Sequence, residues 1–279
     1  MGISLKRLDF NIGRKKNNAM TNLVKFSALL FMLIAGGASA NTEDEICTDD
    51  IRAIVSREMK IEALVPRRQD GNIVSESCKS WPYNKNMMLS AFAYDAGVEY
   101  EKTLVVAMID MKTKRIVSRY QTIISEDAVT EVGEYSLRLD TARYQLAKGV
   151  RAFGLRFNNS ARGASCGEAN WNDELTLLVP EGKQLRPVLS LHMYKQQSIQ
   201  GCLSVQDPTA IWRDANLTIS VEKSSTKGFY DLLATATITH SSNGESLENL
   251  KDHEEQHVFR YNGKIYEKSN SAPWWISFW

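Results

Sequence analysis

Residues 104–120 read LVVAMIDMKTKRIVSRY, a stretch that is typical of two β-strands joined by a tight turn. The run Leu104–Ile109 is continuously apolar, which favours a strand buried on both faces. A polar turn rich in lysine follows, and the apolar pattern resumes at Ile116. The same pairing of segments across a Lys-bearing turn recurs in LTLLVPEGKQLRPVLSL and in HVFRYNGKIYEKS. The sequence therefore predicts a fold built from antiparallel hairpins.

Apolar residues alternate with polar ones along much of the chain from Met87 onward. This period of two is clear in residues 135–139, 153–157, 217–221 and 230–238. Segments of this kind number about eleven, and polar turns separate them. One apolar face on each strand is the pattern of an antiparallel sandwich or of propeller blades. The predicted fold class is therefore mainly β, either sandwich or propeller-like.

One α-helix is expected before these strands. Apolar residues recur at helical spacing from Ile51 to Met59, and Thr48 is a candidate N-cap followed by two aspartates. Acidic residues in the first turn favour a helix N-terminus, because they offset its dipole. Pro66 sets the limit of the pattern. The sequence thus predicts a single N-terminal helix followed by a large β region.

The segment Lys25–Ala40, KFSALLFMLIAGGASA, has the features of a secretory signal peptide. A basic flank leads into an apolar stretch, and Ala38-Ser39-Ala40 fits a signal peptidase site, which predicts cleavage before Asn41. The uncharged run is too short to anchor the chain across a bilayer. Met20 is an alternative start. We therefore expect a soluble protein that is periplasmic or secreted.

Three parts follow from these patterns: a signal peptide in residues 1–40, a helical and disulfide-linked segment in 41–84, and an antiparallel β domain in 85–279. The whole chain has 34 basic and 33 acidic residues. Six basic residues and one acidic residue lie in residues 1–40, so the mature chain has 28 basic and 32 acidic residues. Its net charge of −4 argues against a nucleic-acid partner and against electrostatic docking on anionic lipid.

All four cysteines lie in the exported part: Cys47, Cys78, Cys166 and Cys202. An even number in an oxidising compartment is best interpreted as two disulfides. Four cysteines allow three connectivities, and we favour Cys47–Cys78 with Cys166–Cys202, because each bridge then closes a loop of modest length. A four-cysteine zinc site is the alternative. It requires cysteines spaced two to four residues apart, and no such pair occurs in the sequence.

The segments FRYNGKIY (259–266) and GFYDLL (228–233) resemble closing elements of exported bacterial proteins of the FG-GAP-like propeller type. Two further stretches, SLRLDTARYQLAKGVRAFGLRF and ELTLLVPEGKQLRPVL, resemble segments of uncharacterised exported proteins of Gram-negative bacteria. The resemblance covers about half of the mature chain. It implies an exported β protein and no particular activity. The calcium loops of many propeller repeats are missing from the sequence, so metal binding is not implied.

The segment His253-Glu254-Glu255-Gln256-His257 matches the H-E-x-x-H pattern of zinc proteases. On a helix, the two histidines would lie on one face and Glu254 would act on a zinc-bound water. The surrounding residues are charged nearly all round, and Glu267 is the sole acid downstream for a third ligand. We therefore expect a solvated linker before a strand and no cofactor. A zinc-dependent hydrolase that uses His253, Glu254 and His257 is the alternative.

Aromatic residues crowd the C-terminus, at Trp274, Trp275, Phe278 and Trp279. A sugar-binding or partner-binding surface is one interpretation. We favour a tail that packs back onto the core, because an exposed patch of four aromatic side chains is energetically costly.

The leading functional hypothesis is non-catalytic recognition of another exported protein or a cell-envelope component, for example as an immunity protein or an inhibitor. Loops held by a rigid sheet often carry binding residues, and Trp and Arg are frequent energetic anchors. The loop Asn158–Asp173 offers Arg162 and Trp171, and its Cys166 would hold it in shape. We therefore predict that Arg162 and Trp171 form the contact surface.

Overall fold

The computed structural model describes residues 47–279 except 164–165, 205, 268–270 and 277–279, so the predicted signal peptide in residues 1–40 lies outside the described residues. Helix α1 (Asp49–Met59) begins after Thr48, whose side-chain oxygen accepts a hydrogen bond from the backbone N–H of Ile51 at 3.4 Å. It ends at Lys60, which has a left-handed backbone conformation. The predicted helix and its N-cap are confirmed, and a short 3₁₀ turn (Arg67–Gln69) follows.

Fourteen strands lie in the described part of the chain. They are β1 (Ile73–Ser80), β2 (Met87–Tyr94), β3 (Glu101–Asp110), β4 (Arg115–Ser125), β5 (Leu137–Asp140), β6 (Gln145–Ala147), β7 (Val150–Arg151), β8 (Phe153–Phe157), β9 (Ala169–Glu181), β10 (Gln184–Gln200), β11 (Ile211–Thr226), β12 (Phe229–Ser242), β13 (His253–Tyr261) and β14 (Tyr266–Glu267). Twelve of them form one mixed sheet, and β6 and β7 form a separate hairpin. The prediction of a mainly β protein with one helix is confirmed.

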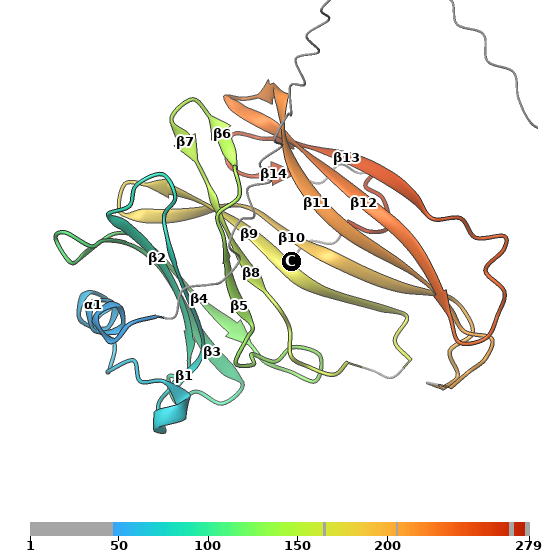
Figure 1. Ribbon diagram of the computed structural model, residues 1–279, viewed down its shortest axis with the longest axis horizontal. Helices are drawn as coiled ribbons and strands as arrows, with labels where there is room; N and C mark the ends of the chain where they lie inside the picture. The colour runs from blue at the N-terminus through green and yellow to red at the C-terminus, as the bar shows by residue number, and fades with distance from the viewer. Residues whose placement is uncertain (1–46, 164–165, 205, 268–270, 277–279) are drawn as a thin grey trace, which may run out of the picture. The chain divides into compact units, whose positions relative to one another are not determined.

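Strands β1 to β4 form an antiparallel meander (Figure 1), in which β2 and β3 are buried along most of their length whereas β4 has one mostly exposed face. Residues 104–109 of β3 are all buried, as the continuous apolar run predicts. Val105 and Ile109 face α1 and pack with its buried residues Ile51 and Val55. The alternate residues of the same strand contact a second core, which explains why β3 has no polar face.

The second core lies between this meander and strands β5 and β8. Leu139 and Phe153 are fully buried there. Two serines on β1 connect the two layers: the Ser75 hydroxyl accepts a hydrogen bond from the backbone N–H of Leu137 at 3.0 Å, and the Ser77 hydroxyl accepts one from Leu139 at 3.1 Å. These hydroxyls satisfy backbone donors that are buried away from water.

The long hairpin β9–β10, yellow in Figure 1, connects the meander to the rest of the sheet. Strand β10 pairs with β9 and with β11 in antiparallel fashion, and it meets β4 in parallel at Gln184 opposite Arg119. This single parallel contact makes the sheet mixed, whereas an antiparallel arrangement was expected throughout. The reason lies in the turn after β9, whose Lys183 carbonyl accepts a hydrogen bond from the Arg119 N–H at 3.1 Å.

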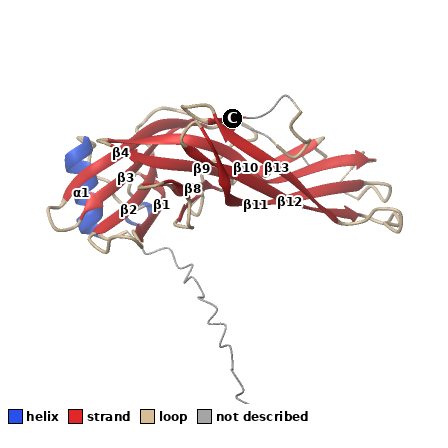
Figure 2. Ribbon diagram, turned by 90° about the horizontal axis from the view of Figure 1, so that it is seen from above, coloured by secondary structure: helices blue, strands red, loops and turns tan. Residues whose placement is uncertain are grey.

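Strands β10 to β13 run side by side, as Figure 2 shows, and one of their faces carries a third core. The C-terminal segment packs onto this face: Trp275 is fully buried and Ile276 is 3% exposed. The expectation of a tail that returns to the core is therefore met for these residues. Phe278 and Trp279 lie outside the described residues.

The structure contains two disulfides, Cys47–Cys78 and Cys166–Cys202. This is the pairing favoured from loop length. Two disulfides indicate an oxidising compartment, because cytosolic thiols are kept reduced. None of the described helices is long and apolar enough to cross a membrane.

Candidate functional site

A cleft of about 690 Å³ lies where the β8–β9 loop, the start of β9 and the segment after β4 meet. Its volume is in the range of small-molecule sites. The loop and the segment after β4 contribute Asn159, Arg162, Asp127 and Val129 to the lining of the cleft. The strands contribute Asn170, Trp171, Asn172, Asp173 and Glu174 from β9, His192 and Gln196 from β10, and Trp212 from β11. Both residues predicted for binding, Arg162 and Trp171, line this cleft.

The structure changes the local assignment of Trp171. We expected Arg162 and Trp171 in one loop that reaches Asp173, but β9 already begins at Ala169, so Trp171 lies on a strand. The strand starts early because β10 extends far enough to pair Lys195 with Trp171. Arg162 remains in the loop and is exposed. The two side chains therefore differ in how firmly the backbone holds them.

Two asparagines fix the loop against its surroundings. The Asn159 side-chain oxygen accepts a hydrogen bond from the N–H of Glu131 at 2.9 Å, which links the loop to the segment after β4. The Asn172 side-chain oxygen accepts one from the N–H of Asn159 at 2.7 Å, which links the loop to β9. Together with the Cys166–Cys202 bridge, these contacts hold the wall of the cleft in shape without a ligand.

The indole of Trp171 is 43% exposed, yet two neighbours position it. The Lys195 ammonium lies 5.8 Å from its ring centroid, within the range of a cation–π contact. The imidazole of His192 lies 6.2 Å away, centroid to centroid. Part of the ring remains open to the cleft and to solvent. Trp171 thus combines a fixed orientation with an accessible aromatic surface.

Glu174 and His192 are cross-strand neighbours within the cleft. Burial raises the pKa of the Glu174 carboxyl, while hydrogen bonds from Ser190 and Thr176 act in the opposite direction. Burial, together with the charge of Lys195, lowers the pKa of His192 to about 4. The imidazole is therefore uncharged at neutral pH. The alternation along β10 puts His192 on the polar face of its strand, which suits a surface or hydrogen-bonded residue, and the side chain is only 5% exposed.

The negative charge of Asp173 is neutralised by Arg156. The Arg156 guanidinium donates to its carboxylate through Nε at 2.6 Å and also through Nη2. The backbone φ of Asp173 is 56°, a left-handed conformation that is uncommon for a residue other than glycine. The two-point contact with Arg156 holds the Asp173 carboxylate in place within β9.

The H-E-x-x-H segment is a strand. His253 opens β13, and His257 lies four residues along it, so about 13 Å separates their backbone positions. A zinc ion needs both ring nitrogens within about 2 Å, which one helical turn provides and an extended strand does not. The expected linker is wrong as well, because Glu254 and its neighbours pair with β12. The described residues contain no group of three His, Cys, Asp or Glu side chains placed to hold a metal.

The side chains around this strand have structural contacts. The Trp275 indole N–H donates to the Glu255 carboxylate at 2.6 Å, and the Arg213 guanidinium lies 3.9 Å from the Trp274 ring centroid. Lys195 donates to the Trp274 carbonyl at 2.6 Å. These contacts fasten the C-terminal segment to β10, β11 and β13.

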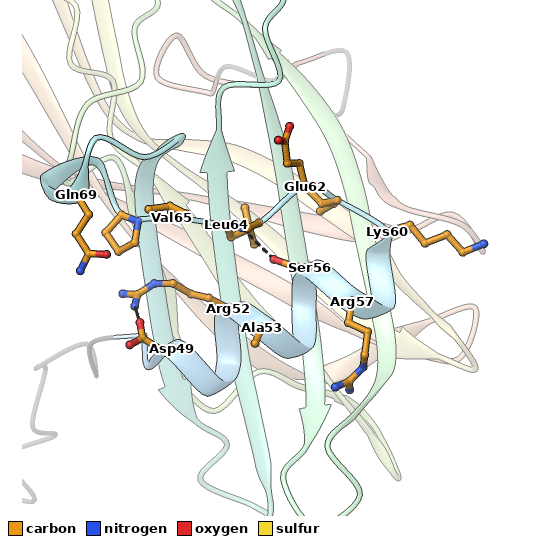
Figure 3. Close-up of a pocket in the computed structure, with 13 residues that line it drawn as sticks. Asp49, Arg52, Ala53, Ser56, Arg57, Lys60, Glu62, Leu64, Val65 and Gln69 are labelled. Carbon is orange, nitrogen blue, oxygen red and sulfur yellow. Dashed lines mark hydrogen bonds and ion pairs between the residues drawn. The ribbon is translucent and has the colours of Figure 1, made fainter.

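A second hollow lies beside α1 and is an open groove of about 800 Å³ (Figure 3). Arg52 spans its base, where it donates to Asp49 at 2.7 Å and to Glu76 at 2.9 Å. The Ser56 hydroxyl accepts a hydrogen bond from the Leu64 N–H at 3.0 Å, which ties the segment after the helix back to it. Arg52 and Ser56 thus stabilise the position of α1 and of the segment that follows it.

Sequence reasoning missed Glu174, His192 and Trp212 as parts of the cleft. A signal was present for Glu174 and His192, since polar residues occupy the even positions 170–176 of β9 and most of the even positions 190–200 of β10. Which of these positions would be covered by the loop could not be read from the alternation.

Comparison of the chain with protein-family models, with curated proteins and with solved structures found no match.

Proposed function

We propose that this protein is an exported binding protein, periplasmic or secreted, and that the cleft at Arg162 and Trp171 is its recognition site. The observation that carries the proposal is the convergence of the two predicted anchor residues on one preformed cleft of about 690 Å³. Its partner is another exported protein or a component of the cell envelope. An immunity or inhibitor role would be one form of this activity.

Three features support binding over catalysis. His192, the histidine of the cleft, has its pKa lowered to about 4, which is far from the value near 7 that suits a general base. The Glu174 carboxylate accepts hydrogen bonds from Ser190 and Thr176, which hold it against the sheet. The preformed wall favours recognition, because little ordering entropy is lost when a partner binds.

The proposal is tested by comparing native protein with Arg162→Ala/Trp171→Ala in retention on an immobilised envelope fraction. Arg143→Ala/Tyr135→Ala is the matched control, because it also removes one arginine and one aromatic side chain, at exposed positions outside the cleft. We expect the cleft variant to lose retention by at least about tenfold, as expected for an anchor residue, and the control to retain it. Equal retention of a normally folded cleft variant would contradict the proposal.

A further inference from the structure

The charges around the cleft define which ligands it can accept. Of the described lining residues, Asp127, Asp173 and Glu174 are acidic and Arg162 is basic. Arg156 neutralises Asp173, and His192 is uncharged at neutral pH. Anionic polymers bind where several cations converge, which this lining does not provide. The groups that remain, Asp127, Glu174 and Arg162, have a net formal charge of only −1, so the lining is also not built to attract a strongly cationic ligand.

The remaining lining is aromatic and amide-rich. Asn170 and Gln196 are directly opposite each other on β9 and β10. Trp212 shares their face of the sheet, because it lies two residues from Asp214, the partner of Gln196 on β11. Trp171 is next to Asn170 on β9, opposite Lys195, and lines the same cleft with a side chain that is 43% exposed. Amides donate and accept hydrogen bonds without carrying charge, and indole faces attract the weakly positive C–H groups of a ring.

The shape of the site argues against a protein as the main occupant. Protein interfaces bury about 800 Å² on each partner, over a broad surface. Here the residues gather in one concave site of about 690 Å³, and its exposed aliphatic surface is small, with Val129 the large aliphatic side chain that is mostly exposed. A compact ligand rich in hydroxyl groups matches both the size and the polarity of this lining.

We propose that the cleft binds a neutral oligosaccharide segment of an envelope glycan, with Trp171 and Trp212 as the stacking surfaces and Asn170 and Gln196 as hydrogen-bonding partners. This inference rests on the proposed function, since it names the ligand of the same site. The Lys195 contact holds one indole in place, and the Gln196 side-chain N–H donates to Asp214 at 2.9 Å, which fixes the orientation of its amide. Both groups are therefore oriented before the ligand arrives.

The test is calorimetric titration of the mature protein with three probes of equal length: hexa-N-acetylchitohexaose, maltohexaose and a heparin hexasaccharide. We expect binding of at least one neutral probe and weaker or no binding of the sulfated one. Trp171→Ala and Trp212→Ala should each weaken binding by about tenfold or more, which is the effect of an anchor residue. Trp171→Phe, which keeps an aromatic face, should weaken it less.

The control is Tyr135→Ala, which removes an aromatic side chain that is 77% exposed and lies outside the cleft. Binding that is unchanged in both tryptophan variants, or stronger for the heparin probe, would overturn the inference. If no neutral probe binds at millimolar concentration while envelope retention still depends on Arg162 and Trp171, the glycan inference fails and the proposed function stands. If retention is independent of the cleft as well, both fail.

Discussion

The two disulfides close loops of similar length, 31 and 36 residues, yet they lie in very different surroundings. Cys47 and Cys78 are 2% and 0% exposed and pack among the side chains of α1 and β3. Cys166 and Cys202 are half-buried and join two loops beside the cleft. The comparison indicates that one bridge is part of the core, whereas the other shapes a surface. Because the loops are of similar length, chain entropy alone would predict nearly equal stabilisation of the fold by the two bridges.

The largest effect is expected for Cys47→Ala/Cys78→Ala. Loss of the cross-link costs roughly 3 to 4 kcal/mol in the chain-entropy model, and the buried sulfur atoms leave a cavity that adds about 1 kcal/mol. Urea unfolding monitored by circular dichroism measures the change. A loss no greater than that of the second pair would contradict the assignment of this bridge to the core.

Cys166→Ala/Cys202→Ala should destabilise the fold less, by up to roughly 3 kcal/mol, because its loops can open without unpairing the sheet. Its main consequence should appear locally, as faster proteolysis within residues 158–168 and weaker retention on envelope material. Limited proteolysis followed by mass mapping locates the cut. Protection equal to that of the native loop would show that Asn159 and Asn172 hold the wall without the bridge.

The free energy of unfolding should depend on pH through a group in the cleft, which distinguishes the cleft from the α1 region. The pKa of His192 is about 4 in the folded protein and near 6.5 in the unfolded chain. The unfolded state therefore binds more protons between these values, and stability falls as the pH drops from 6.5 toward 4, by roughly 2 to 3 kcal/mol at pH 4.5. Glu174, whose folded-state pKa is raised, acts in the opposite direction.

This dependence is measured as the difference in unfolding free energy between pH 7 and pH 4.5. The variant His192→Asn should reduce this difference in unfolding free energy. The control His253→Asn replaces an exposed histidine and should keep most of the difference. An unchanged difference in the His192 variant would show that other groups carry the acid sensitivity.

The smallest effect is expected for Arg68→Ala. The Arg68 guanidinium pairs with Glu134 at 2.7 Å, which connects the segment after α1 to the segment before β5. Both side chains are mostly exposed, at 81% and 53%, so water and salt screen the pair. No measurable change in the urea midpoint is expected. A clear decrease in the urea midpoint would mean that this ion pair stabilises the α1 region, as the Cys47–Cys78 bridge does.

The sequence by itself determined the helix and the mainly β composition of the chain, and it favoured the observed pairing of the cysteines over two others. Each of these depends on local chemistry: Thr48 caps its own helix, the apolar run 104–109 requires cover on both faces, and short loops favour local bridges. Arg162 and Trp171 could also be named as candidates, because their residue types and their position near Cys166 are visible in the chain.

Only the tertiary structure decided which side chains surround these candidates. The H-E-x-x-H pattern is compatible with a helix, but pairing with β12 extends it into a strand and separates its histidines. His192 alternates as a surface residue would, but its burial in the cleft lowers its pKa. Alternation specifies the face of a strand on which a residue lies. What covers that face depends on contacts between segments far apart in the chain, here Asn159 with Glu131 and β10 with β4.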